Sequence, residues 1–153
     1  MLGCHYSSLW EKLNREVKMG AYDQWNKLNP SEKAAILLYP VLAAVVPRAK
    51  DKAFSETKTR FGINGHNDKS DAFRHCYWSS LITRDAGVLA AITFTTAHEN
   101  TPSNPPDEKA MDLHNNSVGI GIAIRRPLLA TDKILSDACY KALTDGKLKV
   151  IKP

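Results

Sequence analysis

The sequence predicts an all-α fold, a single-domain helical bundle of about six to seven helices over residues 1–153. Apolar residues recur at helical spacing in one segment after another. Proline and glycine stand between these segments, where helices usually end. No series of alternating polar and apolar residues indicates strands. The chain has 153 residues, 43% of them hydrophobic, which is enough for one core.

The first half of the chain is expected to contain three helices. Apolar spacing predicts one over residues 7–18. Ser31 is a suitable cap for a second helix, which ends before Pro40 because proline disfavours helical conformation in the residue that precedes it. A third helix begins at Pro40 itself and runs to about residue 61, where Gly62 can take the left-handed conformation.

The second half is expected to contain four further helices, separated by polar or proline-rich loops. Thr131 is a suitable cap for the last of them. The tail after Gly146 is expected to form either one short strand or an extended strip. The expected helices cover residues 70–86, 88–98, 107–124 and 132–144.

Composition narrows the classes of partner. The formal charge is +5, from 21 basic and 16 acidic residues, which permits contact with nucleic acid, anionic lipid or cell-wall polymer. The basic residues are dispersed, however, and aromatic residues are not interleaved with them, so nucleic acid is not expected as a partner. Three cysteines cannot form a fully paired set of disulfides within the chain.

No segment of the sequence predicts a transmembrane helix or a signal peptide. The apolar run over residues 34–47 is too short to span a bilayer and contains two prolines. The first residues lack the charged region and the continuous apolar region of a signal peptide. We therefore expect synthesis in the cytoplasm, with export by a signal-independent route left open.

Four of the five histidines fall in three short polar clusters, and each cluster mixes histidine with carboxylate or amide residues. Buried polar groups are costly unless they are paired, so three such clusters in one compact chain predict a single assembled site. The clusters read GHNDKSDAFRH (65–75), TTAHEN (95–100) and EKAMDLHNN (108–116).

The first cluster lies on one helix face. Arg74, His75 and Trp78 follow Asp71 by three, four and seven positions. Asp71 and His75 could ligate one metal ion, or the carboxylate could fix the tautomer of the imidazole. Arg74 could hold two oxygens of a phosphate or carboxylate, and Trp78 is expected to be buried beside the site. The alternative is an ordinary surface pair of Asp71 and His75 near a helix N-terminus.

The other two clusters supply the remaining candidates. Glu99 follows His98 at a helix C-terminus, where its charge opposes the helix dipole, and this unfavourable position is weak evidence for a role in a site. Asn115 and Asn116 are unusual inside an apolar helix and could orient a neighbouring group, although a kinked helix is the alternative. Gly119 would permit close approach of another helix.

Facing helices of a bundle can bring such acid/base groups and metal ligands together. Nothing marks a serine or cysteine nucleophile, and no HExxH, Walker or GxGxxG pattern occurs. The candidates for catalysis are Asp71, Arg74, His75, His98, Glu99, Asp112, Asn115 and Asn116. The candidates for substrate binding are His66, Trp78 and His114, and those for a divalent metal are Asp71, His75 and Glu99.

Three elements, DAFRHCYW, AHE and MDLHNNSVG, resemble in this order the DAxRHxxW, HE and MDxxNNxxG elements of an uncharacterised family of helical domains in bacteria. The resemblance covers residues 62–122, which form the motif-bearing core. Such domains occur alone or as terminal modules of surface, secreted or toxin-type proteins. The resemblance implies a site at the matching positions, which are Asp71, Arg74, His75, Trp78, His98, Glu99, Asp112, Asn115, Asn116 and Gly119.

Two functions compete on these observations. The first is a hydrolase of effector or toxin type, which acts on an envelope polymer, a phospholipid or another phosphoester and has a cognate inhibitor protein as partner. His75 would then be the general base or a metal ligand, Asp71 would orient it, and Glu99 would be an acid/base group or a second ligand. The second is a binding or interaction module without turnover, in which the clusters form a buried polar network that fixes helix packing.

Overall fold

The computed structural model describes residues 23–126 and 129–152. Six complete helices, α2 to α7, make up most of this part, and no strand occurs in it, so the predicted all-α fold is confirmed. The helix expected over residues 7–18 lies outside the described residues. The helices are α2 (Pro30–Leu38), α3 (Leu42–Phe61), α4 (Lys69–Ala86), α5 (Val88–His98), α6 (Pro106–Ile124) and α7 (Asp132–Thr144).

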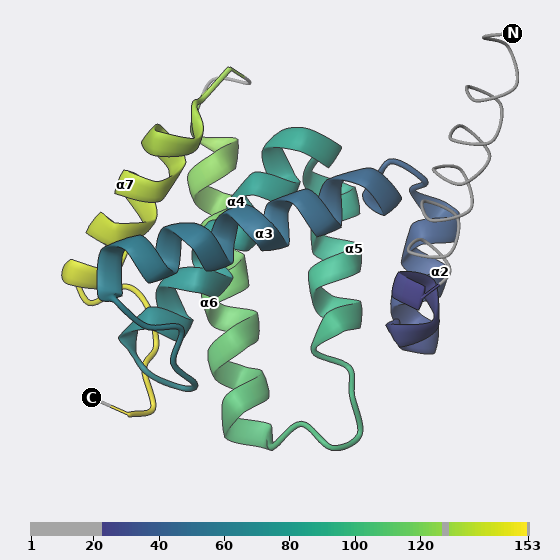
Figure 1. Cartoon of the computed structure of the whole chain (residues 1–153), viewed down its shortest axis with the longest axis horizontal. Coiled ribbons are helices and arrows are strands. Elements are labelled where there is room, and N and C mark those ends of the chain that lie inside the picture. Colours follow the sequence, from purple (N-terminus) through teal and green to yellow (C-terminus); the bar gives the residue numbers. More distant parts are fainter. Residues whose placement is uncertain (1–22, 127–128, 153) are drawn as a thin grey trace, which may run out of the picture.

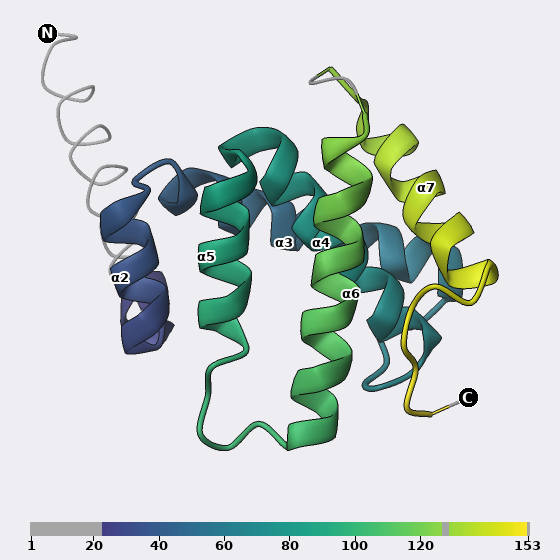
Figure 2. The same cartoon turned by 180° about the vertical axis from the view of Figure 1, so that it is seen from behind.

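Helix α4 is the centre of the bundle. It packs against α3, α5, α6 and α7, whereas α2 packs against α5 and α3. Helix α3 crosses one side of the bundle, and α5 and α6 run next to each other on the opposite side (Figures 1 and 2). Most residues of α4 are buried, and they include the fully buried Phe73, Leu81 and Ile82. This burial places the polar first turns of α4 inside the molecule as well.

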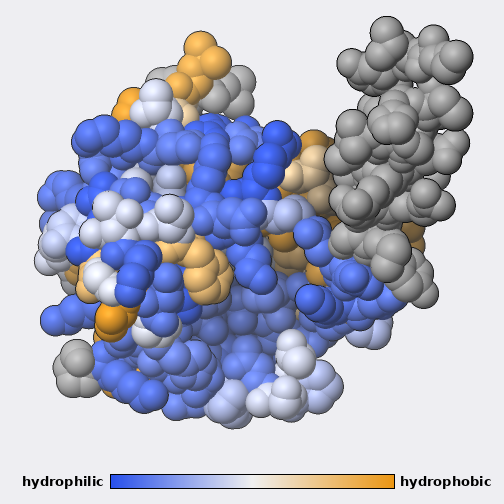
Figure 3. All heavy atoms as spheres, in the orientation of Figure 1, coloured by the Kyte–Doolittle hydropathy of each residue, from blue (hydrophilic) through white to orange (hydrophobic). Residues whose placement is uncertain are grey.

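The side crossed by α3 is mostly hydrophilic, with scattered apolar side chains (Figure 3). Among the described helices, none combines the length and the apolar character that a membrane span requires.

Two of the expected helix starts are wrong. Asn29, and not Ser31, caps α2: its side chain accepts a hydrogen bond from the backbone N–H of Glu32 (2.8 Å), and the Glu32 carboxylate accepts one from the backbone N–H of Asn29 (2.7 Å). Helix α3 begins at Leu42, because Pro40 lies in a turn that closes with the hydrogen bond from Leu42 N to the carbonyl of Tyr39.

The expected helix ends and the last cap are confirmed. Gly62 ends α3 in the left-handed conformation, with φ of +73°. The side chain of Thr131 accepts a hydrogen bond from Ile134 N at the start of α7. Pro106 occupies the first turn of α6, where its missing N–H costs nothing.

Gly119 lets α4 and α6 touch at backbone distance. A Cβ atom at this position would lie 2.0 Å from the carbonyl oxygen of Cys76 and 2.2 Å from Oγ of Ser79. At the same contact, the hydroxyl of Ser79 donates a hydrogen bond to the carbonyl of Asn116 (3.0 Å). The expected close approach at Gly119 is therefore confirmed, and it brings the polar first half of α6 against that of α4.

The tail after α7 is an extended strip and not a strand. The amide of Asn115 is hydrogen-bonded to both backbone groups of Lys149, at 2.9 and 3.0 Å. The N–H groups of Ile151 and Lys152 donate to the carbonyl of Asn67, at 3.0 and 2.8 Å. The tail is thus fixed to α6 and to the loop before α4, on the side of the molecule that holds the polar clusters.

Candidate functional site

His75 is the meeting point of the three polar clusters. Its Nε2 lies 3.4 Å from Oδ1 of Asp71, one turn earlier on α4, and 3.4 Å from Oδ1 of Asp112 on α6. Its Nδ1 lies 3.6 Å from Oε1 of Glu99, which follows the last residue of α5. Three elements therefore bring one imidazole and three carboxylates together, as the single-site prediction requires.

Asp71 is held as an anion that orients the ring. It accepts hydrogen bonds from the guanidinium of Arg74 and from the backbone N–H of Asn67 (2.6 Å). Burial raises the pKa of Asp71, but the hydrogen bond with His75, the one from Asn67 and the positive charges of His75 and Arg74 outweigh it and lower the pKa below its ordinary value. Arg74 also donates to the carbonyl of Gly65 at 3.1 and 3.2 Å, which fixes the loop before α4.

Glu99 is buried, with 3% of its surface exposed, and amides contact it on both oxygens. The side chain of Asn116 donates to Oε1 at 3.1 Å, and that of Asn104 donates to Oε2 at 3.3 Å. Asn116 is itself 1% exposed, and its amide faces Glu99 from α6. The Glu99 carboxylate is therefore positioned by hydrogen bonds rather than by a Lys or Arg ion pair in the described chain.

The electrostatics of the cluster favour protons on His75 and on Asp112. Burial and, to a smaller extent, the negative charges of Glu99, Asp71 and Glu108 together raise the pKa of Asp112 to about 6, against the lowering effect of His75. Burial lowers the pKa of His75, but the hydrogen bond with Asp71 and the charges of Asp112 and Glu99 outweigh it, so that this pKa is raised.

Several buried polar atoms of the cluster have no hydrogen-bond partner within the described chain. They are Nδ1 of His75, Oδ1 of Asp112 and Oδ1 of Asn116, together with the indole Nε1 of Trp78. Unsatisfied buried polar groups are rare in native proteins, and each needs an explanation. Here they lie around one histidine, which points to a bound species rather than to loose packing.

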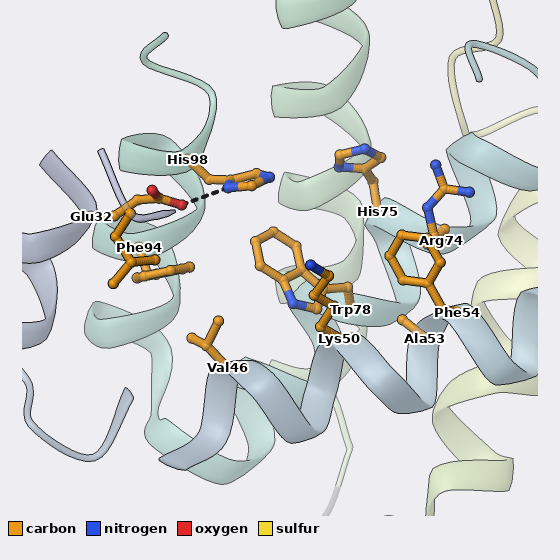
Figure 4. A pocket seen from close by; sticks show the side chains of 11 residues that line it. Glu32, Val46, Lys50, Ala53, Phe54, Arg74, His75, Trp78, Phe94 and His98 are labelled. Atoms are coloured by element: carbon orange, nitrogen blue, oxygen red, sulfur yellow. Dashed lines mark hydrogen bonds and ion pairs between the residues drawn. The ribbon is translucent and has the colours of Figure 1, made fainter. Parts of the chain in front are cut away.

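A cavity of about 320 Å³ opens beside His75. Figure 4 shows Arg74 and His75 at one end, His98 and Glu32 at the other, and Trp78 between them. Helix α3 supplies one wall, which sequence reasoning did not foresee. The lining residues are Leu28, Glu32, Val46, Lys50, Ala53, Phe54, Arg74, His75, Trp78, Phe94 and His98.

Of Asp71, His75, Glu99 and Asn116, only His75 lines this cavity within the described part of the chain. Trp78 lies where it was expected, buried with 8% of its surface exposed, and its ring meets that of His75 edge-on with centroids 6.4 Å apart.

His98 belongs to the cavity and not to the carboxylate cluster. Its Nδ1 lies 2.7 Å from Oε1 of Glu32 on α2, and the two side chains close one end of the cavity (Figure 4). Burial raises the pKa of Glu32, but the hydrogen bonds with His98 and with the Asn29 backbone outweigh it and lower the pKa. Sequence reasoning missed Glu32. The available signal, its spacing from Asn29, indicates only a capping box.

The structure places three candidates outside the cluster. His66 has 68% of its side chain exposed and lies 3.4 Å from Glu108. Nε2 of His114 lies 2.9 Å from the carbonyl oxygen of Lys147 in the tail. The side-chain amide of Asn115 donates to and accepts from the backbone of Lys149 in the tail. Substrate binding by His66 and His114 and catalysis by Asn115 stay predictions: His66 is mostly exposed near Glu108, whereas His114 and Asn115 contact the tail.

The fold and the site together define a class: an all-helical domain in which a buried histidine lies among three carboxylates beside an apolar cavity. Residues 33–147 match the family model described as a domain of unknown function, DUF6973, and the chain belongs to this family. The prediction of an uncharacterised domain family is confirmed at this level. No match to the chain exists among the solved structures.

Proposed function

We propose that the chain is a hydrolase that acts on an ester or phosphoester bond of an amphiphilic molecule, with a phospholipid as the leading substrate class. The observation that carries the proposal is the position of His75. Its ring lies within 3.6 Å of three carboxylates and also borders a cavity of about 320 Å³. His75 therefore belongs both to a cluster of acid/base or metal-ligating groups and to the wall of a cavity large enough for a ligand.

The residues around the cavity favour an amphiphile over an envelope polymer. The wall between its two ends is apolar and includes Val46, Phe94 and Trp78. Arg74 and Lys50 add positive charge at the rim, which suits a phosphate or carboxylate head. A polysaccharide would instead need a series of polar partners along the wall.

The reaction class that fits these residues is acid/base or metal-assisted hydrolysis. The candidate nucleophiles near His75 are occupied or inaccessible: the hydroxyl of Ser79 is hydrogen-bonded to backbone carbonyls, that of Ser80 donates to the carbonyl of Tyr77, and Cys76 is fully buried. His75 and the carboxylates of Glu99 and Asp112 would carry the proton transfers or hold the ion that activates water. Arg74 would stabilise negative charge that develops on the substrate.

The test is a hydrolysis assay of the purified chain on long-chain and short-chain phospholipids, lysophospholipids and soluble phosphoesters. His75→Ala is expected to lower turnover by at least about 100-fold, the usual scale for an essential acid/base group. His66→Ala is the matched control, since this exposed histidine lies outside the cluster, and it should retain full activity. Circular dichroism of both variants checks the fold. Full activity in folded His75→Ala would refute the proposal.

The toxin-type context that the resemblance implies belongs to the same proposal. An effector with this activity would harm the bacterium that makes it, so a cognate inhibitor protein would cover the cavity. Production of the chain in a bacterial host should then slow growth, and His75→Ala should relieve the effect. If the His75→Ala variant slows growth as well, the toxicity does not depend on this site.

A second function, a binding or interaction module without turnover, is favoured by a different observation. Several polar side chains of the clusters fix neighbouring backbone: Arg74 holds Gly65, and Asn115 holds Lys149. If the whole cluster were such a network, removal of any member would destabilise the fold. If it is a functional site, removal of a buried carboxylate leaves stability unchanged or improves it.

A further inference from the structure

We infer that His75, Glu99 and Asp112 bind one divalent cation, with the side-chain oxygen of Asn116 as a fourth protein ligand. This inference concerns the same side chains as the proposed function and deepens it, but it does not require that any substrate be hydrolysed. It commits to a ligand set that differs from the one expected from sequence, because Asp112 stands in place of Asp71.

The spacing of the donor atoms fits one ion. One atom from each of His75, Glu99 and Asp112 lies within 4.8 Å of the atoms from the other two. Nitrogen and oxygen ligands bind divalent metals at roughly 2.0–2.6 Å, so two ligands of one ion are at most about 4–5 Å apart. Small side-chain rotations would bring all three donors to bonding distance of a common point.

The charges of the cluster favour a cation. Asp71 is paired with Arg74, but neither Glu99 nor Asp112 has a Lys or Arg partner within 4.0 Å among the described residues. In the described part of the chain, His75 is their only basic neighbour at that distance. Two buried carboxylates with such weak compensation are costly, and a bound cation would remove most of this cost.

The unpartnered atoms supply independent support. Asn116 is 1% exposed, and while its Nδ2 donates to Oε1 of Glu99, its Oδ1 has no partner within the described chain. Oδ1 of Asp112 and Nδ1 of His75 are also without a hydrogen bond there. When His75 is neutral with its proton on Nε2, all three atoms can donate an electron pair. A cation satisfies them together.

Asp71 then has the role of a positioning residue. Its carboxylate and that of Asp112 both lie 3.4 Å from Nε2 of His75, whereas Nδ1, on the side of Glu99, has no hydrogen bond within the described chain. A ligating histidine usually donates its other ring N–H to a carboxylate, which fixes the tautomer and makes the ligand more basic. The hydrogen bonds from Arg74 and from the Asn67 backbone hold this carboxylate in place.

The ligand chemistry indicates the kind of ion. One imidazole with carboxylate and amide oxygens, and no thiolate, suits Mn²⁺ or Zn²⁺ rather than Cu⁺. His75 also borders the cavity, so an ion here would be close to a substrate bound in it.

The test is a titration of chelator-treated protein with MnCl₂ alone. Binding is measured by the electron paramagnetic resonance signal of free Mn²⁺ and by isothermal titration calorimetry. We expect one ion per chain. Asp112→Asn and Glu99→Gln should each weaken binding at least 10-fold. Their control, Asp107→Asn at an exposed position in the first turn of α6, should leave the affinity unchanged. Competition with ZnCl₂ and MgCl₂ then ranks the ions.

A second readout protects the test against variants that fail to fold. In wild-type protein, Mn²⁺ should broaden the NMR signals of the His75 ring and of the nearby Trp78 indole before those of His66. Binding of no divalent ion, or broadening centred elsewhere, would overturn the inference. Absence of binding together with hydrolysis that survives complete chelation would overturn the inference while leaving the proposed function in place. Specific binding without any hydrolysis would support the inference and refute the function.

Discussion

A buried carboxylate such as Asp112 is costly to keep ionised. This cost makes the free energy of unfolding depend on pH, which can be measured. Its folded-state pKa of about 6 lies above the ordinary 3.8. The folded protein therefore binds this proton more tightly than the unfolded chain does. The resulting stability is fully present below pH 3.8 and is lost as the pH rises through 6.

We predict that Asp112→Asn stabilises the metal-free protein at pH 8, by up to about 2–3 kcal/mol, since a shift of about two pKa units corresponds to roughly that free energy. The gain should shrink as the pH falls from 6 towards 4. Denaturant unfolding at several pH values with chelator present measures it. Asp107→Asn, an exposed aspartate on the same helix, should change little. Destabilisation at pH 8 would instead favour the purely structural network.

Sequence reasoning at the residue scale succeeds where helix geometry decides. Asp71 and His75 are one turn apart, so their shared face follows from the spacing alone. It fails for Asn115 and His114, because their partners are backbone groups of the tail, whose path no local pattern encodes. Likewise, the sequence alone does not show that Glu32 on α2 contacts His98 at the end of α5.

Among the elements, the contact between α4 and α6 is the one on which the site depends. Gly119 lets the two backbones approach, and Asn116 and Asp112 lie about one and two turns before it on α6. The sequence indicated such an approach through a glycine inside a helix. The direction of approach could not be predicted, because it depends on which faces of the other helices remain uncovered.

We predict that Gly119→Ala destabilises the fold by about 3 kcal/mol or more, at or above the usual range for overpacking, because its Cβ would overlap the carbonyl of Cys76. Gly121→Ala is the matched control: its Cβ would meet only the end of the Arg125 side chain, at 3.4 Å, and alanine favours helix by up to about 1 kcal/mol. Thermal unfolding of both variants decides. Equal stabilities would contradict the close contact.

Helix α3 contributes the wall of the cavity, and this gives a prediction about substrate length. Val46→Trp should fill the cavity and lower activity on long-chain amphiphiles at least about tenfold, while activity on short-chain esters stays within about twofold. Val41→Trp, at the exposed start of the same helix, should affect neither. Parallel assays on the two chain lengths measure the split. An equal loss on both would mean that the cavity does not hold the chain.

At the scale of the whole molecule, the ion pair between Glu32 and His98 joins α2 to α5 and closes the cavity. The folded-state pKa of Glu32 lies below the ordinary 4.5, so this carboxylate contributes stability above pH 4.5 that is lost as the pH falls through the lower, folded value. Acid is therefore expected to loosen α2 before the core around α4.

We predict that Glu32→Gln is less stable than wild type at pH 7 by about 1–2 kcal/mol, the scale of a charge-assisted hydrogen bond. Glutamine can still complete the capping box with Asn29, so the change isolates the contact with His98. The difference should disappear as the pH falls well below 4.5. Chemical unfolding at pH 7 and at pH 3.5 tests it, and a difference that is equal at both pH values would show that the charge of Glu32 plays no part.

The hydrogen bonds that fix the tail have a consequence for folding during synthesis. The loop residue Asn67 holds Asp71 through its N–H and accepts hydrogen bonds from Ile151 and Lys152 through its carbonyl. A ribosome delivers these tail residues after every helix of the bundle. While residues 147–152 are still in the exit tunnel, the emerging chain can pack α4 against α6 but cannot close this loop. The chain would thus have an organised core before Asp71 is fixed beside His75, because the loop that holds Asp71 closes only when residues 151 and 152 have left the ribosome.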